Sequence, residues 1–346
     1  MVPTVAPFPV LERVPMICHD DAVGQPNTAD ALPGTLPVIA VTGPTASGKS
    51  DVGVALAHRL ADLGTPGEVV NADALQFYRG MDIGTAKIGQ AERQGVPHHL
   101  LDVLDVTQTA EVAQFQGWAR AAFDAITARG HVPILVGGSG LYVRAALDDL
   151  RFPGKDPRVR ARWEAELDRV GPRALHERLT RTDPEAAARI LPTNGRRIVR
   201  ALEVGEITGQ PFAAALPEPA YLRPTVQVAL AVPREQLVAR IDARVDRMWA
   251  AGLVEEVRHL ASRGLREGLT AGRALGYAQV LDVLDGTSTE DEARELTARL
   301  TRRFARKQES WFRRDPRVHW LPAPDGTTAD ELARRVLPLL PVASAA

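Results

Sequence analysis

Cysteine is almost absent from the 346-residue chain, in which only Cys18 occurs. A single cysteine excludes an intrachain disulfide and any zinc site built on several cysteines. So low a cysteine content is typical of proteins in a reducing compartment, and we expect a cytoplasmic protein. The pair His98–His99 has no further His or Cys at ligand spacing, and we expect it to be structural.

Long apolar runs and an excess of charge are missing as well. No hydrophobic segment approaches the roughly 20 residues that span a bilayer, so no membrane association is expected. The formal net charge is −1, so nucleic-acid contacts must come from local basic patches. Residues 1–36 are rich in Pro, Ala and Asp without a signal-peptide pattern, and we expect them to form a disordered extension.

An alternation of apolar runs and helical patterns fills the first half of the chain. Strands are predicted at 37–43, 68–73, 98–103 and 132–138, and helices at 49–63, 110–129 and 139–147. This alternation predicts an α/β fold with a parallel sheet flanked by helices.

The pattern changes after residue 151. Short helical segments interrupted by proline predict a small all-helical insertion domain at 153–193. A helix is then predicted at 194–209, with Asn194 as its cap and Gly209 as its end. A strand at 225–232, helices to about residue 311 and an edge strand at 317–321 follow. The α/β core with its C-terminal helices would comprise 37–152 and 194–335.

The strongest motif is "GPTASGKS", between the first predicted strand and helix. Its spacing, G-x-x-x-x-G-K-[ST], is that of a phosphate-binding loop, in which backbone N–H groups point at anionic oxygens. Lys49 adds a positive charge, and the Ser50 hydroxyl can reach a bound Mg²⁺ ion. The motif therefore predicts a P-loop NTPase-like fold, Mg²⁺ as cofactor with Ser50 as its ligand, and a diphosphate or nucleotide site formed by Gly43, Pro44, Thr45, Ala46, Ser47, Gly48, Lys49 and Ser50.

Two further segments should end at the same edge of the sheet as this loop. Asp73 follows a predicted strand, where a carboxylate can act as a general base or lie near magnesium, although Asp is also common in turns. Ser139, in "GGSGLYV", places a hydroxyl there, although a serine at this point can simply cap a helix.

The loop alone leaves the reaction open. No magnesium-holding Asp ends the strand "VPILVGG", and no N-K-x-D stretch occurs, which counts against steady nucleotide hydrolysis. A small-molecule or nucleotide kinase is one alternative, and a non-catalytic, nucleotide-gated RNA-binding protein is another. Three basic clusters occur: the arginines at 158, 160 and 162, those at 196, 197 and 200, and a stripe from 299 to 307. Such stripes are usually solvated faces, but three of them in one near-neutral protein favour an RNA partner.

Taken in order, the motifs resemble one family, the tRNA dimethylallyltransferases of bacterial type. The resemblance spans about 38–312 and rests on "GPTASGKS", "NADALQFYRGMDIGTAK", "PHHLLDV", "VPILVGGSGLY", "NGRRIVRALEV", "RIDARVDRMWAAGLVEEV", "ALGYAQ" and "TRRFARKQESWF". It implies transfer of a dimethylallyl group from dimethylallyl diphosphate to the exocyclic N6 amine of the adenosine immediately 3′ of the anticodon in tRNA. Diphosphate would be released.

The resemblance also implies roles for individual residues. Asp73 would be the base, Ser139 would help to hold the amine, and residues 45–50 would cradle the diphosphate. Ala74 departs from the family, in which serine is usual, and Ser139 stands where threonine is usual. A monomer is expected, with the insertion domain contacting the anticodon stem-loop. The residues implied to bind tRNA are Asp73, Ala74, Leu75, Gln76, Ser139, Arg160, Arg196, Arg197, Ile198, Val199, Arg200, Arg273, Ala274, Leu275, Gly276, Tyr277 and Ala278.

Overall fold

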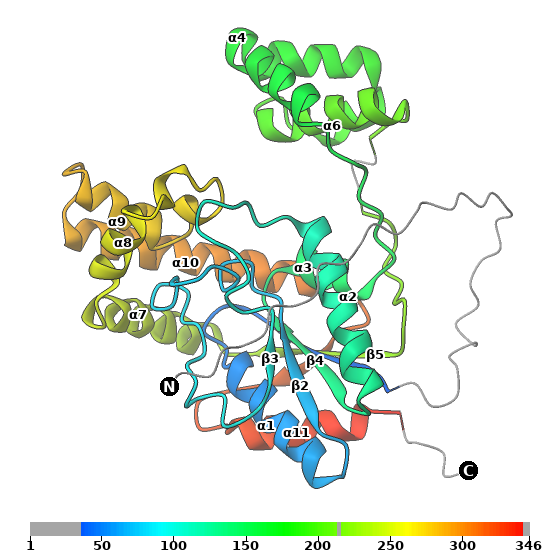
Figure 1. Ribbon diagram of the computed structural model, residues 1–346, viewed down its shortest axis with the longest axis vertical. Coiled ribbons are helices and arrows are strands. Elements are labelled where there is room, and N and C mark those ends of the chain that lie inside the picture. The colour runs from blue at the N-terminus through cyan, green and yellow to red at the C-terminus, as the bar shows by residue number, and fades with distance from the viewer. Residues whose placement is uncertain (1–35, 213–215, 342–346) are drawn as a thin grey trace, which may run out of the picture. The chain divides into compact units, whose positions relative to one another are not determined.

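The computed structural model of the protein describes residues 36–212 and 216–341 (Figure 1). The expected disordered extension, 1–36, lies outside the described residues except for its last residue. A six-stranded sheet is formed in the order β3-β2-β4-β1-β5-β6, and every neighbouring pair is parallel. The strands are β1 (Val38–Thr42), β2 (Gly67–Asn71), β3 (His98–His99), β4 (Val132–Gly137), β5 (Thr225–Ala231) and β6 (His319–Pro322). The predicted parallel α/β fold is confirmed, including the late edge strand.

Both faces of the sheet are covered, which explains why the central strands are continuous apolar runs. Along β1, Val38 and Ala40 belong to one hydrophobic cluster, and Ile39 and Val41 belong to another on the opposite face. The second cluster is closed by α1 (Lys49–Asp62) and α11 (Ala329–Val336), which lie side by side (Figure 1). Helices α2 (Val112–Ala128) and α3 (Gly140–Leu147) contribute to the first.

The third strand is shorter than the sequence predicts. Its pairing ends at His99, whereas the apolar run continues to residue 103. Leu100 and Asp102 both adopt positive φ angles, 62° and 57°, so the chain turns away from the sheet. Hydrophobicity predicted an extended run where the backbone bends.

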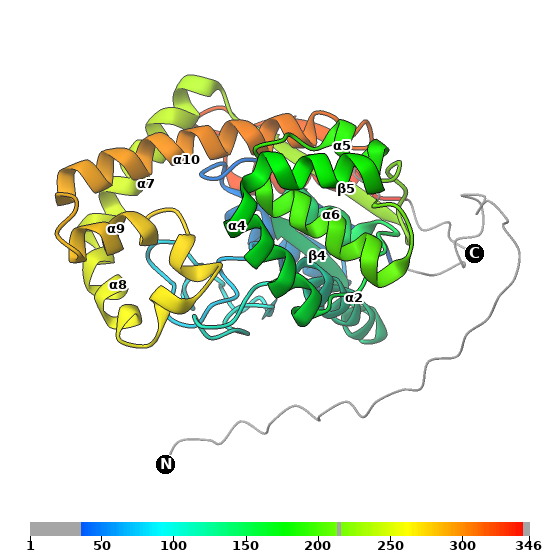
Figure 2. The same cartoon turned by 90° about the horizontal axis from the view of Figure 1, so that it is seen from above.

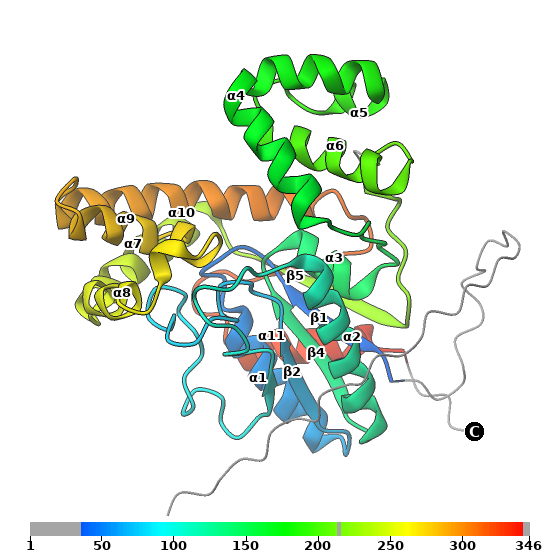
Figure 3. The ribbon, with the colours of Figure 1, turned by 45° about the horizontal axis from the view of Figure 1, so that its top comes forward.

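The helical insertion contains α4 (Pro157–Thr182), α5 (Pro184–Arg189) and α6 (Gly195–Thr208) (Figure 3). Helix α4 is kinked at Gly171, which has φ 78° and is followed by proline. Asn194 caps α6 by accepting from the Arg197 N–H, and Gly209 ends it at φ 67°, as predicted.

The packing of α6 bears on where the insertion, expected at 153–193, ends. The apolar face of α6 packs against α4 in a hydrophobic cluster that is separate from the sheet's two clusters. A boundary at residue 193 would cut this cluster in two, so we propose that the insertion extends through α6. The cluster is composed of Trp163, Leu175, Leu179, Ala186, Ala187, Ile190, Ile198, Val199, Ala201 and Leu202.

The C-terminal helices are α7 (Arg234–Ala250), α8 (Leu253–Ala261), α9 (Tyr277–Leu284) and α10 (Glu290–Phe312), with short 3₁₀ turns at Leu265–Glu267, Ala271–Arg273 and Leu337–Leu339. Helix α10 packs against α7 and α9 and also reaches α3, beside the sheet (Figure 2). Within 36–212 and 216–341, no helix combines the length and apolarity needed to cross a membrane.

Candidate active site

The phosphate loop joins β1 to α1, as its sequence predicts. Gly43 and Gly48 have φ angles of 136° and 88°, values that side chains disfavour, and Gly48 begins α1. Ala46 is also held in the left-handed region, at φ 62°. The Ser47 hydroxyl is buried and has no hydrogen-bond partner among the described residues, so a ligand oxygen could satisfy it.

Lys49 folds back over the loop and donates from Nζ to the Pro44 carbonyl at 2.7 Å. Desolvation of the amino group and, to a lesser extent, the positive charge of Arg244 lower the pKa of Lys49, which lies at about 8. The Asp73 carboxylate acts in the opposite direction and raises the pKa. Lys49, Arg244 and Asp73 are therefore close enough to sense one another's charge.

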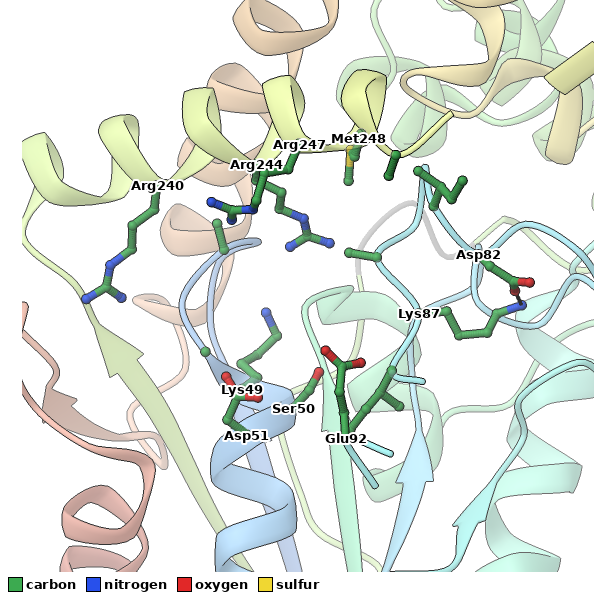
Figure 4. A pocket seen from close by; sticks show the side chains of 16 residues that line it. Lys49, Ser50, Asp51, Asp82, Lys87, Glu92, Arg240, Arg244, Arg247 and Met248 are labelled. Atoms are coloured by element: carbon green, nitrogen blue, oxygen red, sulfur yellow. Dashed lines mark hydrogen bonds and ion pairs between the residues drawn. The ribbon is translucent and has the colours of Figure 1, made fainter. Parts of the chain in front are cut away.

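A pocket of about 690 Å³ opens over the loop and is shared with the segment after β2 and with α7 (Figure 4). Arg240, Arg244 and Arg247 extend from α7 on the side that faces Lys49. Arg240 is also paired with Asp325 at 2.6 Å. The sequence reasoning did not single out these arginines, although their i, i+4, i+7 spacing places them on one helical face. The pocket is lined by Ala46, Gly48, Lys49, Ser50, Asp51, Asp82, Ile83, Ala86, Lys87, Ile88, Glu92, Arg240, Arg244, Arg247, Met248 and Ala251.

Arg244 ties the phosphate loop to the "DIGTAK" segment. One terminal nitrogen donates to the Thr85 carbonyl at 3.1 Å, and the other lies 3.4 Å from the Thr45 hydroxyl. Burial lowers the pKa of Arg244, while the Asp73 charge raises it. An arginine that is largely removed from water beside a phosphate loop is suited to bind a multiply charged anion.

Asp73 and Ser139 lie at the ends of two neighbouring strands. Asp73 follows β2 and Ser139 follows β4, which pair in register with Asn71 opposite Val136. The backbone after Asp73 is fixed because its carboxylate accepts from the Leu75 N–H at 3.0 Å. Ser139 occupies the N-cap position of α3, but its side chain makes no capping hydrogen bond. Neither residue lines the pocket itself.

The residues beside the phosphate loop suit a magnesium ion that takes most of its ligands from the substrate. Ser50 lines the pocket together with the carboxylates of Asp51 and Glu92. Burial raises the pKa of Asp51, and the nearby Glu92 raises it further. Among the described residues, no group of three or more His, Cys, Asp or Glu is placed to hold a metal ion. Few protein ligands combined with phosphate oxygens and water are typical of Mg²⁺. His99 instead pairs with the buried Glu68, at 2.6 Å.

The arginines of the helical insertion that are expected to bind tRNA come from α4 and α6 and differ in exposure. They share a shallow pocket at the start of α6, together with Thr193, Asn194 and Gly195. Arg160 and Arg200 are paired with the fully buried Glu203 at 3.2 and 2.8 Å. Arg196 and Arg197 are more exposed to solvent than Arg160 and Arg200.

Ile198 and Val199 require a correction as tRNA-contacting side chains. Both are buried in the cluster that joins α6 to α4, with 0% and 1% of their surface exposed. Their apolar side chains hold the helix in place and cannot reach an external ligand.

The "RALGYA" segment requires a similar correction. Arg273 is exposed and Leu275, Gly276 and Ala278 range from buried to half-buried, but Ala274 and Tyr277 belong to the hydrophobic core. The Tyr277 hydroxyl donates to Glu256 of α8. Glu256 in turn accepts from the backbone N–H groups of Asp82, Ile83 and Gly84, at 3.1, 2.8 and 3.2 Å. Tyr277 therefore supports the loop that borders the pocket.

The remaining predicted contacts lie on partly exposed surfaces. Ala74, Leu75 and Gln76 are half-buried in the loop after Asp73, and Gln76 donates to the carbonyls of Thr85 and Ala86. On α10, the basic stripe forms a shallow pocket with an aromatic side chain. Its lining residues are Arg303, Arg306, Lys307, Ser310, Trp311 and Arg314.

Comparisons with known proteins show the family to which the chain belongs. The model of the IPP transferase family matches residues 76–315, more than half of the chain. A tRNA dimethylallyltransferase of Kineococcus radiotolerans is 77% identical over 94% of this chain and 100% of its own length. One from Thermobifida fusca is 68% identical, covering 83% of this chain and 91% of its own.

Solved structures give the same relationship. The full-length tRNA isopentenylpyrophosphate transferase of Bacillus halodurans matches with a TM-score of 0.64 at 39% identity. The match covers 87% of this chain and 96% of that one. With such identities over nearly the whole length of its relatives, the chain belongs to the IPP transferase family.

Proposed function

We propose that this protein transfers the dimethylallyl group of dimethylallyl diphosphate to the exocyclic N6 amine of the adenosine immediately 3′ of the anticodon in tRNA. The observation that carries the proposal is the grouping of Asp73 with the phosphate loop. The charge of Asp73 alters the pKa of both Lys49 and Arg244, so a base and a diphosphate site adjoin.

The diphosphate end of the reaction is supported by the loop and by α7. When the allylic C–O bond breaks, negative charge develops on the departing diphosphate oxygen. Lys49, Arg244 and the loop N–H groups are placed to stabilise this charge. Ser50 would hold a magnesium ion, which when bound neutralises further charge on the diphosphate.

The amine end is supported by Asp73 and Ser139. The adenine N6 amine is a weak nucleophile because its lone pair is delocalised into the ring. As the new C–N bond forms, its proton passes to the Asp73 carboxylate, a step that general-base catalysis typically accelerates about 10²–10⁴-fold. The Ser139 hydroxyl, which caps no helix N–H, is available to orient the amine.

RNA binding would involve the exposed arginines of α6 and the basic stripe of α10. The target base has to leave its stack to reach a strand-end site, and flipped bases are held by aromatic and cationic side chains. Trp311 lies beside the α10 stripe, lines the same pocket and is partly exposed. We also propose that the enzyme acts as a monomer in the cytoplasm.

The test is incorporation of labelled dimethylallyl groups into a tRNA that has adenosine 3′ of its anticodon, in the presence of Mg²⁺. We expect one label per tRNA, and a variant tRNA with guanosine at that position should remain unlabelled. Absence of label with the natural tRNA, alongside an active control enzyme, overturns the proposal. A parallel incubation with ATP labelled at the γ-phosphate would detect a kinase.

A further inference from the structure

One buried side chain of α10 connects the two loops on which the proposed reaction depends. Gln308 is 7% exposed. Its Oε1 accepts from the backbone N–H of Thr45, in the phosphate loop, at 2.8 Å. Its Nε2 donates to the carbonyl of Gly138, the residue before Ser139, at 2.9 Å. An amide is needed for both bonds, since one partner is a donor and the other an acceptor.

The glycines on either side of Ser139 pack so closely against α10 that neither position has room for a side chain. A Cβ atom at Gly138 would lie 2.4 Å from Gln308 Nε2 and 3.0 Å from the Gly43 carbonyl oxygen. A Cβ at Gly140 would overlap the Trp311 ring, at 1.9 Å. The glycines after β4 therefore let α10 and the phosphate loop approach the Ser139 segment closely.

The helix that carries Gln308 also carries the basic pocket. It lies between Lys307 and Trp311, both of which line the basic pocket of the same helix. A single rigid helix thus presents cations on one side and holds the two loops on the other. Helix α10 therefore belongs both to the surface expected to bind RNA and to the contacts that hold the phosphate loop beside the Ser139 segment.

We propose that Gln308 is a positioning residue, which fixes the distance between the diphosphate loop and the segment that holds the amine. This inference rests on the proposed function, in which these loops hold the two reactants. Transfer requires the reacting carbon and nitrogen to approach within near-attack distance, and a misplacement of about 1 Å can slow a reaction about 100-fold. Gln308 touches neither reactant and acts through Thr45 and Gly138.

Two substitutions of Gln308 test its two hydrogen bonds. Gln308→Met keeps the length of the side chain and removes both hydrogen bonds. Gln308→Glu keeps an acceptor for the Thr45 N–H but turns a second acceptor toward the Gly138 carbonyl. We expect single-turnover transfer to slow by about 10- to 100-fold in the Met variant and by at least as much in the Glu variant. KM for each substrate should change by less than about threefold, because the binding groups remain.

Gln116→Met is the matched control. Gln116 also donates to two backbone carbonyls, those of Ala145 and Leu150 at 3.1 and 2.7 Å, but on α2 and away from the phosphate loop. This variant should lose comparable thermal stability while its transfer rate stays within about twofold of the parent. A wild-type rate in Gln308→Met or in Gln308→Glu, an equal loss in Gln116→Met, or a loss confined to KM would overturn the proposal.

A measurement that needs no activity distinguishes this inference from the proposed function. Hydrogen exchange of the Thr45 amide should be at least about tenfold faster in Gln308→Met than in the parent and unchanged in Gln116→Met, because only the former removes its acceptor. Unchanged exchange overturns the positioning role even if the wild-type protein proves to transfer no label. An unlabelled tRNA together with faster exchange would overturn only the proposed reaction.

Discussion

The edge of the sheet and the helical insertion both carry clusters of charged residues, but they use them differently. At the edge, Lys49 and Arg244 face a pocket, and the pKa of each is lowered by desolvation and raised by the charge of Asp73. In the insertion, Arg160 and Arg200 are paired with the buried Glu203, whereas Arg196 and Arg197 are exposed. Cationic side chains that line a pocket are suited to bind an anionic ligand, whereas arginines that are paired with a buried carboxylate stabilise the packing of the helices around them.

Lys49→Ala should produce the largest effect and should be confined to the edge. Loss of a charged donor to the diphosphate is expected to weaken dimethylallyl diphosphate binding by about 100-fold, or about 2.7 kcal/mol. Affinity for tRNA should stay within about twofold, because the arginines proposed to bind RNA lie elsewhere. Calorimetry with each ligand separately measures both.

Arg59→Ala is the matched control for this change. It removes a cation from the same helix, but one that pairs with Asp330 instead of facing the pocket. Diphosphate affinity should be unchanged. Equal losses of diphosphate and tRNA binding in Lys49→Ala would mean that the phosphate loop positions RNA. The sheet edge and the helical insertion would then not differ in their ligands.

Diphosphate binding should depend on pH because the pKa of Lys49 is lowered to about 8. Below that value the amine is already cationic and affinity should be flat. Above it, binding must take up a proton, so the dissociation constant should rise about tenfold per pH unit. Calorimetry from about pH 7 to about pH 10 measures the slope, and Lys49→Arg, which stays charged, should give a flat profile. A flat profile for the parent would contradict a lowered pKa.

Glu203→Gln should have a smaller effect, confined to the insertion. The amide keeps the shape of the side chain but loses the charge that holds Arg160 and Arg200, which we expect to destabilise α6 by about 1–2 kcal/mol. Hydrogen exchange of α6 amides should accelerate while that of β1 amides stays unchanged. Equal acceleration in both would show that the insertion does not unfold independently of the sheet.

The parts of the fold and site that sequence reasoning predicted are those with local signals. The phosphate loop was found from its spacing, and the position of Asp73 from the rule that strand ends share one edge. The short β3 was missed because its end depends on backbone turns at Leu100 and Asp102, which side-chain patterns do not show. Gln308 was missed because its partners, Thr45 and Gly138, are distant in sequence.

The roles of buried residues were the hardest to predict. In "RRIVR" the apolar residues between the arginines face α4, and in "RALGYA" the tyrosine faces Glu256. A sequence motif singles out every residue of a segment, but successive residues of a helix point in different directions. Only the packing separates side chains that face a ligand from those that hold the segment in place.

Single-turnover kinetics with Asp73→Asn and Arg196→Glu test most directly whether chemistry belongs to the sheet edge while the insertion contributes RNA binding without chemistry. At saturating concentrations of both substrates, Asp73→Asn should slow transfer by at least about 100-fold with unchanged tRNA affinity, because only the base is lost. Arg196→Glu should weaken tRNA binding by about tenfold and leave the saturated rate unchanged. A wild-type rate in Asp73→Asn, or a parallel loss of rate and affinity in both variants, would contradict this division.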